Sequence, residues 1–241
     1  FQPDLQALEA AITPRTKALV VNSPNNPSGV VYSPETLQAM ADLLRRKAAE
    51  YGHPIYLISD EPYRELVFQG FTTPWIPNYY DDTLVCYSYS KSLSLPGERI
   101  GYILVGEKVA LRQEVYAAIC GAGRALGYVN APSLFQRVVA ECDGLTSDLA
   151  VYQTNRDLLY QGLTKMGYTC VEPGGTFYLF LKSPEPDANA FCKRAQAYDL
   201  LFPPADDFAC PGWCRIAFCT GTDKVERALP IFEKLAKEYG L

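Results

Sequence analysis

Three clusters of polar residues have the types needed for a site that handles an amine and a phosphate. They lie at residues 22–29 (NSPNNPSG), 60–63 (DEPY) and 88–91 (SYSK), and Arg99 follows the lysine of the third cluster. Each cluster comes directly after an apolar run typical of a buried strand. Ligands of open α/β sheets bind at the carboxyl ends of the strands, so we predict that the three clusters converge there.

Lys91 is the residue of these clusters with the most distinctive chemistry. It follows an apolar strand, with two serines just before it. A lysine near an apolar sheet edge has its charged form disfavoured, and a neutral amine forms Schiff bases. Pyridoxal phosphate is the cofactor that uses such a lysine. The alternative is a solvated surface lysine among ordinary turns, and turns alone would explain Pro24, Pro27 and Gly29.

Pyridoxal phosphate also needs an acid at its ring nitrogen, donors at its phenolic oxygen, and hydroxyls with a cation at its phosphate. Each requirement is met by a residue of the right type in the clusters. The candidates are Asp60 for the ring nitrogen, Asn26 and Tyr63 for the phenolic oxygen, and Ser88 and Arg99 for the phosphate. We expect the nearby acids Glu61 and Glu98 to be solvated or to form structural ion pairs.

The elements around these clusters predict an α/β layered fold, in which crossovers join any parallel strands. Apolar runs predict strands at 17–22, 54–59, 83–88 and 99–105, and helical spacing predicts helices at 1–12 and 33–51. From Gly106 the pattern is helical to about residue 142. A helix at 148–166, strands at 176–181 and 213–219, and a helix at 223–239 follow. We place a domain boundary near 143–148, which gives domains 1–145 and 146–241.

The composition predicts a soluble globular protein. The chain has 241 residues, of which 48% are hydrophobic and 20% charged, with a net charge of −5. No apolar run approaches the ~20 residues of a membrane helix. The absence of a basic block argues against a nucleic-acid or anionic-membrane partner.

The eight cysteines and one histidine do not predict a metal site. No Cys-x-x-Cys pair occurs, and His53 is far in sequence from the cluster of Cys210, Cys214 and Cys219. Buried, reduced thiols of a cytosolic protein are the favoured interpretation. His53 lies in a turn, where a surface role is favoured, so triad chemistry has only a poorly placed candidate.

The clusters also carry a family resemblance. Residues 88–101 (SYSKSLSLPGERIG) resemble the lysine-attachment segment of class I/II aminotransferases, which are fold type I enzymes of the aspartate aminotransferase superfamily. Residues 22–29 are similar to that family's Asn-Pro-Thr/Ser-Gly segment, and residues 60–63 to its Asp-x-x-Tyr element. Residues 174–178 resemble a small-domain segment that enters the site. The motifs occur in the family's order, and the resemblance extends over essentially the whole chain.

The resemblance implies a three-layer αβα large domain that binds pyridoxal 5′-phosphate, incomplete here, and a smaller α+β C-terminal domain. Family members carry a further segment before the position of Phe1, so the chain looks like the later part of a larger enzyme. The implied activity is transfer of an amino group between an amino acid and a 2-oxo acid. The resemblance also implies a cytoplasmic homodimer in amino-acid metabolism and biosynthesis.

Residue by residue, the resemblance implies that Lys91 forms the Schiff base and shuttles the proton at the substrate. Its other implied roles are Asp60 at the ring nitrogen, Asn26 and Tyr63 at the phenolic oxygen, Ser88, Arg99 and Ser90 at the phosphate, and Arg215, with Asn26, at the substrate α-carboxylate. Arg215 lies inside an otherwise apolar strand, and a planar guanidinium suits a carboxylate. A surface salt bridge is the alternative for this arginine.

Two other functions remain open. A pyridoxal-phosphate-dependent carbon–sulfur β-lyase would share Lys91, Asp60 and Tyr63. Release of pyruvate from cystathionine would favour the lyase, and steady amino transfer to 2-oxoglutarate would favour the transferase. The third possibility is an aminotransferase-like binding or regulatory domain, although no helix-turn-helix or basic region occurs in these residues.

Overall fold

The computed structural model describes residues 1–241, which divide into two compact units. The N-terminal unit comprises residues 1–23, 32–65 and 73–147, and the C-terminal unit comprises residues 24–31, 66–72 and 148–241. The short loops 24–31 and 66–72 therefore belong to the C-terminal unit. The chain crosses from the N-terminal unit to the C-terminal unit for the last time between Ser147 and Asp148. The division of the chain into domains near residue 145 stays a prediction.

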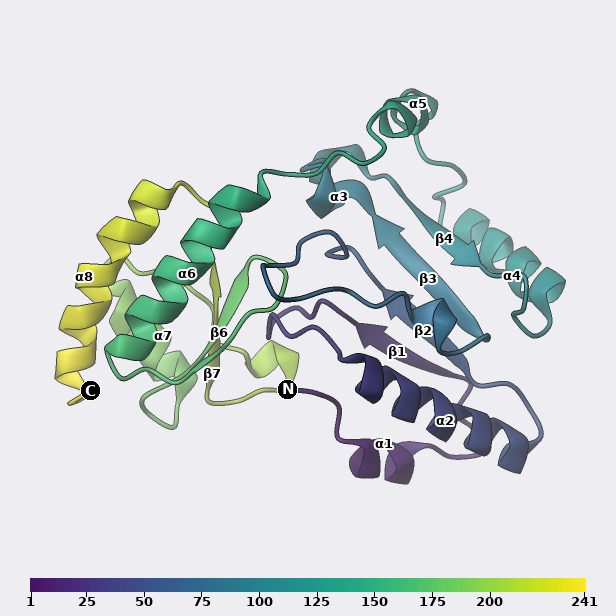
Figure 1. Ribbon diagram of the computed structural model, residues 1–241, viewed down its shortest axis with the longest axis horizontal. Helices are drawn as coiled ribbons and strands as arrows, with labels where there is room; N and C mark the ends of the chain where they lie inside the picture. The colour runs from purple at the N-terminus through teal and green to yellow at the C-terminus, as the bar shows by residue number, and fades with distance from the viewer. The chain divides into compact units, whose positions relative to one another are not determined.

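The N-terminal unit contains a four-stranded sheet, which confirms the α/β prediction (Figure 1). Its strands are β1 (Ala18–Asn22), β2 (Tyr56–Asp60), β3 (Thr83–Ser88) and β4 (Gly101–Val105), in that order across the sheet. The pairs β1–β2 and β2–β3 are parallel, and β3–β4 is antiparallel. Each strand lies within two residues of the range predicted for it. The parallel strands therefore end at one edge of the sheet.

Helix α2 (Pro34–Tyr51) supplies five of the eleven buried residues of the hydrophobic cluster that packs against this sheet (Figure 1). Ser33 caps its N-terminus by accepting a hydrogen bond from Thr36 N at 3.1 Å, and Gly52 ends it in the left-handed conformation. Its buried face packs in one cluster with Ile55 and Leu57 of the β2 segment. Each fully buried leucine contributes roughly 1.5–3 kcal/mol, so this packing holds β2 in place. Helix α1 (Leu5–Ala11) lies against the same cluster.

The region after β4 differs from the prediction of continuous helix to residue 142. Two helices form, α4 (Arg112–Ala125) and α5 (Ser133–Glu141), separated by residues 126–132. Gly127 adopts a φ of 82°, and Pro132 precedes α5, and both end helical continuity. Neither helix has a buried residue. The N-terminal unit also contains the short helices α3 (Tyr89–Ser92), η1 (Ile76–Asn78) and η2 (Pro96–Glu98).

The C-terminal unit is an antiparallel sheet packed with helices. Strands β5 (Cys170–Val171), β6 (Tyr178–Lys182) and β7 (Trp213–Ala217) are joined in that order. The helices are α6 (Leu149–Lys165), α7 (Ala188–Gln196), α8 (Thr222–Glu238) and the short η3 (Asp206–Phe208). Four fully buried phenylalanines form the centre of the core: Phe180, Phe191, Phe218 and Phe232. The sequence predicted α6, α8, β6 and β7 but not α7 or β5.

The cysteines and His53 lie outside the three polar clusters, and the structure shows how exposed they are and what they contact. Only Cys214 is fully buried, and Cys120 and Cys219 are exposed, so the expectation of buried thiols is wrong for most of the eight free cysteines. The ring nitrogens of His53 lie 2.9 Å from the carbonyl oxygens of Pro54 and Pro14. No group of three or more potential ligands is arranged to hold a metal ion. None of the helices combines the length and apolar character needed to cross a membrane.

Glu61 and Arg64 form a largely buried ion pair just after β2. Arg64 Nε donates to Glu61 Oε2 at 2.6 Å, and Ser59 Oγ donates to Glu61 Oε1 at 2.6 Å. The guanidinium carbon of Arg64 also lies over the rings of Trp75 and Tyr87, at 4.6 and 4.9 Å from the ring centres. The Glu61 side chain is only 1% exposed. Glu61 is therefore an ion-pair partner, one of the two structural alternatives expected for it.

Arg64→Ala should destabilise the protein by about 3–5 kcal/mol, because it leaves the buried Glu61 carboxylate without a cation. The matched control is Arg46→Ala, which removes the exposed pair between Arg46 and Glu9 and should cost at most about 1 kcal/mol. Urea unfolding measures both. If both variants lost the same free energy of unfolding, the structural importance of the buried pair would be contradicted.

Candidate functional site

The turn that carries Lys91 begins without a loop at the end of β3. Ser88 is both the last residue of β3 and the N-cap of α3. Its Oγ accepts from Ser90 N at 3.2 Å and donates to Ser90 Oγ at 2.8 Å. Lys91 lies in the single turn of α3 and is partly buried. Two hydroxyls and an amine are thus presented by one strand-to-helix turn.

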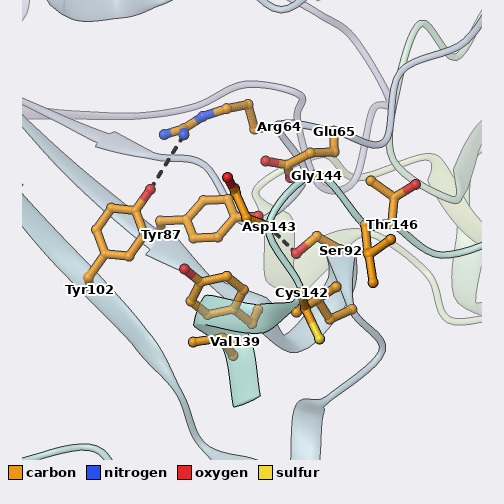
Figure 2. A pocket seen from close by; sticks show the side chains of 13 residues that line it. Arg64, Glu65, Tyr87, Ser92, Tyr102, Val139, Cys142, Asp143, Gly144 and Thr146 are labelled. Carbon is orange, nitrogen blue, oxygen red and sulfur yellow. Dashed lines mark hydrogen bonds between the residues drawn. The ribbon is translucent and has the colours of Figure 1, made fainter. Parts of the chain in front are cut away.

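Helix α3 is held in place by hydrogen bonds from both sides. Figure 2 shows the Tyr87 hydroxyl directed at Ser92, and the two oxygens lie 2.8 Å apart. Ser147 Oγ donates to the carbonyl oxygens of Lys91 and Ser92, at 2.9 and 3.0 Å. Burial raises the pKa of the Tyr87 hydroxyl, which therefore stays a donor. The cavity of about 310 Å³ in Figure 2 lies beside this anchor and is lined by none of the predicted site residues.

Asp60 ends β2, beside the end of β3. The sheet register pairs Asp60 with Asn22 on one side and with Cys86 on the other. Asn22 Nδ2 donates to the backbone oxygen of Asp60 at 2.9 Å and to its Oδ2 at 3.2 Å. Burial raises the pKa of the Asp60 carboxyl, and no cation of the chain forms an ion pair with it. Sequence reasoning gave Asn22 no role, because its pairing with Asp60 depends on a sheet register between residues that are distant along the chain.

Arg99 lies in the turn before β4, which pairs antiparallel with β3. The register sets Gly101 opposite Ser88, and Tyr89 N donates to Ile100 O at 3.2 Å, so the Arg99 turn lies beside the start of α3. Gly101 is required there because a Cβ would collide with the backbone oxygen of Tyr87. Arg99 is exposed, has a φ of 51°, and its Nη1 donates to Pro96 O at 2.6 Å.

A cavity of about 780 Å³ adjoins this edge of the sheet. Asp60 and Ser88 line it together with Arg124 of α4 and Tyr128. Tyr63 is buried in the segment that follows β2. The N-terminal unit therefore gathers six of the predicted residues at one end of its sheet: Asp60, Tyr63, Ser88, Ser90, Lys91 and Arg99.

The other two predicted residues contact each other within the C-terminal unit. Arg215, on β7, donates from Nη1 to Asn26 Oδ1 at 2.9 Å. The guanidinium also lies 4.5 Å from the ring centre of Tyr178 and 4.9 Å from that of Phe208. No carboxylate of the chain forms an ion pair with Arg215. The alternative of a surface salt bridge is therefore wrong.

The loop that carries Asn26 is closed on itself and tied to the segment before β6. Asn25 Oδ1 accepts from Ser28 N at 3.1 Å and from Ser28 Oγ at 2.6 Å. Gly29 has a φ of 71°, and a Cβ there would lie 2.9 Å from Pro173 and from Tyr178 O. The backbone oxygen of Gly29 accepts hydrogen bonds from the backbone amides of Gly174 and Gly175, at 2.8 and 3.0 Å. Only glycine fits this position.

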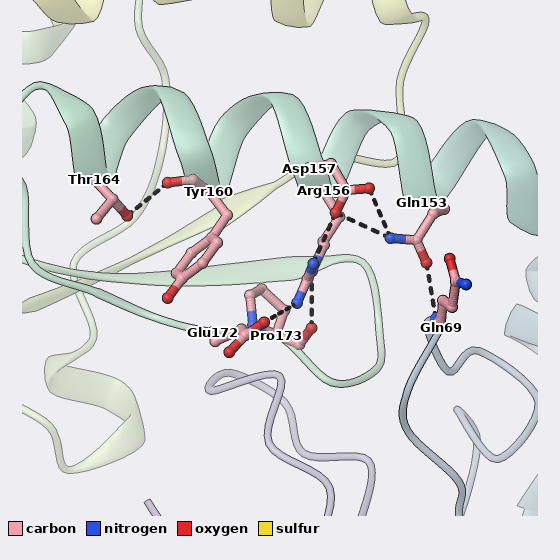
Figure 3. A network of polar contacts seen from close by, with 8 residues as sticks. All are labelled: Gln69, Gln153, Arg156, Asp157, Tyr160, Thr164, Glu172 and Pro173. Atoms are coloured by element: carbon pink, nitrogen blue, oxygen red, sulfur yellow. Dashed lines mark hydrogen bonds and ion pairs between the residues drawn. The ribbon is translucent and has the colours of Figure 1, made fainter.

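Helix α6 fixes the same segment through Arg156 (Figure 3). Arg156 Nε donates to Pro173 O at 3.1 Å, and Nη2 to Glu172 Oε1 at 2.7 Å. Its Nη1 bonds Asp157 at 2.7 Å, and Gln153 accepts from Gln69 N at 2.9 Å. The Arg156 side chain is only 10% exposed. This network gives the Asn26 loop a rigid support.

Comparisons with known proteins match nearly the whole chain. The family model described as aminotransferase class I and II matches residues 1–230. An aspartate/prephenate aminotransferase of Thermus thermophilus is 33% identical over 98% of this chain and 60% of its own length. An amino transferase structure from Eubacterium rectale is 55% identical with a TM-score of 0.97, over 100% of this chain and 61% of that one. The chain thus spans about three fifths of the length of the relatives it matches.

Asp60→Asn should stabilise the ligand-free protein at pH 7. Because burial raises the folded-state pKa of this carboxyl, its ionised form costs stability above that pKa, and the cost vanishes below the unfolded pKa of about 4. Asparagine keeps an acceptor for Asn22. Thermal unfolding measured between pH 7 and pH 4 should show a higher midpoint for Asp60→Asn than for the parent protein at pH 7, and this difference should disappear as the pH falls.

The control for this comparison is Asp42→Asn, on the exposed face of α2, where only a surface pair with Arg45 is lost. Its effect should stay within about 1 kcal/mol at every pH. A lower midpoint for Asp60→Asn than for the parent protein at pH 7 would contradict the assigned cost of burial.

Proposed function

The chain belongs to the class I and II aminotransferase family, and on that premise we propose that it serves the pyridoxal-phosphate-dependent transfer of an amino group between an amino acid and a 2-oxo acid. The observation that carries this proposal is the strand-to-helix turn of Ser88, Ser90 and Lys91 beside Asp60 on the neighbouring parallel strand. An amine, two hydroxyls and an acid at one sheet edge are the donor set that such a transfer needs.

The residues at this edge fit pyridoxal 5′-phosphate, the cofactor on which the family depends. When bound, the cofactor supplies an aldehyde that condenses with amines and a ring that withdraws electrons from the substrate α-carbon. Lys91 is the amine that would hold the aldehyde carbon. Ser88, Ser90 and Arg99 would hold the phosphate, since hydroxyl donors and a guanidinium bind its oxygens.

Asp60 would hold the proton on the ring nitrogen. Its carboxylate is half-buried and forms no ion pair with a cation of the chain, so its charge is available to a cationic ring nitrogen. Asn22 fixes its orientation through the 3.2 Å hydrogen bond to Oδ2. Lys91, once its amine is free, would take the proton from the substrate α-carbon and return it.

Asn26 and Tyr63 would donate hydrogen bonds to the phenolic oxygen. Arginine only donates, so the Asn26 oxygen faces Arg215, and the Asn26 amide NH₂ is the group that would donate to the phenolic oxygen. Arg215 would bind the substrate α-carboxylate through two parallel N–H bonds. The lack of an ion pair with the chain leaves its positive charge for that carboxylate.

We also propose that the protein acts as a homodimer in the cytoplasm, in amino-acid metabolism and biosynthesis. Exposed apolar side chains gather between residues 102 and 145, among them Ile103, Tyr116, Tyr128 and Leu134, and such a surface favours burial against another polypeptide. Eight free cysteines favour a reducing compartment. Relatives are named aspartate and aspartate/prephenate aminotransferase, so aspartate as amino donor and prephenate as 2-oxo acid are the first substrates to try.

Borohydride reduction of the cofactor-loaded full-length protein should leave a pyridoxyl group on Lys91, located by peptide mass analysis. Lys91→Ala should lower kcat by about 10²–10⁴-fold, because no other group moves the proton. Lys108→Ala, at an exposed ion pair with Asp81, is the control and should leave kcat unchanged. An adduct on another residue would refute the role of Lys91. Formation of pyruvate, ammonia and homocysteine from cystathionine would show elimination in place of transfer.

Arg215→Leu should raise KM for the amino acid by about 10- to 100-fold, because a charged pair of hydrogen bonds to the α-carboxylate is lost. The absorbance of the bound cofactor should not change. Arg227→Leu, which removes an exposed pair on α8, is the matched control and should leave KM unchanged. Loss of cofactor absorbance with an unchanged KM would assign Arg215 to the cofactor instead.

A further inference from the structure

Arg215 is oriented by two aromatic rings in addition to Asn26. Its guanidinium carbon lies 4.5 Å from the centre of the Tyr178 ring and 4.9 Å from that of Phe208. Tyr178 is the first residue of β6, the strand paired with β7, and it is buried. Phe208 comes from outside the sheet, at the end of η3. Two separate segments thus bring a ring to the same cation.

The backbone around η3 is built so that Phe208 returns to β7. Ala205, which is fully buried, donates from N to Trp213 O at 2.8 Å, and Arg215 N donates to Pro203 O at 3.1 Å. Cys210 N then donates back to Ala205 O at 3.0 Å and closes the turn. The segment before η3 is therefore fixed alongside β7.

The two rings restrain the orientation of the Arg215 guanidinium, as an ion pair would, but they do not neutralise its positive charge. A free arginine side chain loses about 2 kcal/mol of rotamer entropy when it is fixed in one orientation. A single hydrogen bond to a neutral amide contributes roughly 0.5–1.5 kcal/mol, and each ring adds about 0.5–2 kcal/mol. Stacking covers the guanidinium and does not compete for the N–H donors in its plane, which are the groups that a carboxylate needs.

We propose that Phe208, together with Tyr178, is a positioning residue for carboxylate recognition by Arg215. This inference rests on the proposed function, because it assigns the purpose of Arg215 to the substrate carboxylate. Phe208 is the residue to test, since Tyr178 also pairs in the sheet and packs its ring 4.8 Å from that of Phe177. A positioning role requires that loss of the Phe208 ring raises KM and leaves kcat nearly unchanged.

The kinetic test uses the full-length, cofactor-loaded protein with L-aspartate as amino donor and 2-oxoglutarate as acceptor. Phe208→Ala should raise KM for L-aspartate about 3- to 10-fold and change kcat less than about twofold, from the loss of one ring contact. Phe208→Tyr keeps the ring and should restore the parent KM. Phe208→Leu keeps apolar volume without a ring and should behave like alanine.

Phe202→Ala is the matched control for general destabilisation. Phe202 lies on the same segment, but its ring packs against Phe232 and Phe191, at 5.9 and 5.7 Å. This variant should lower the thermal midpoint without a change in KM. If Phe202→Ala raises KM as much as Phe208→Ala, the effect is structural and the positioning role is wrong.

A crystal structure of Phe208→Ala gives a readout that does not depend on activity. The proposal expects Arg215 to leave Asn26 Oδ1 in this variant and to keep the contact in Phe208→Tyr. An Arg215–Asn26 contact unchanged in Phe208→Ala overturns the inference. If the parent protein transfers no amino group from a panel of the common amino acids, the proposed function fails, and the same crystal structure still decides whether Phe208 positions Arg215.

Discussion

The parallel pairing of β1, β2 and β3 is the constraint on which the rest of the candidate site depends. Parallel strands end at the same edge, so Asn22, Asp60 and the start of α3 meet there although they are far apart in sequence. A shift of one residue in this register would turn Asp60 to the opposite face of the sheet. The packing of α2 against Ile55 and Leu57 opposes such a shift, because it would expose the buried side of β2. The apolar core therefore fixes the polar site.

The features of the fold and the candidate site that depend on a local sequence pattern could be predicted from the sequence. Strand positions, the range of α2 and the polar clusters follow from composition and spacing, which act over a few residues. The roles of Asn22 and Phe208 depend on contacts with residues that are distant along the chain, Asp60 for the first and Arg215 for the second. The break between α4 and α5 had a local signal in Gly127, but the apolar spacing on both sides concealed it. Most cysteines are only partly buried because burial depends on packing that spacing does not encode.

Two neighbouring acids at the end of β2 show how the fold separates a structural charge from an available one. Glu61 is 1% exposed and is neutralised by Arg64 at 2.6 Å. Asp60 is half-buried and has only the neutral Asn22 amide, which orients the carboxylate without compensating its charge. An acid that is desolvated and left without a counterion costs stability, and such groups concentrate at functional sites. This contrast favours Asp60 over Glu61 as the acid that a ligand would engage.

The same physical arrangement recurs in the C-terminal unit with the opposite sign of charge. Asn26 orients Arg215 as Asn22 orients Asp60, through one hydrogen bond from or to a neutral amide. A carboxylate partner would orient the guanidinium more strongly, but it would also neutralise the charge that attracts an anionic ligand. The rings of Tyr178 and Phe208 resolve this conflict, because they restrain the guanidinium while its charge and its in-plane donors are kept. An unneutralised charge held by neutral neighbours is thus common to the Asp60 pair of the N-terminal unit and the Arg215 pair of the C-terminal unit.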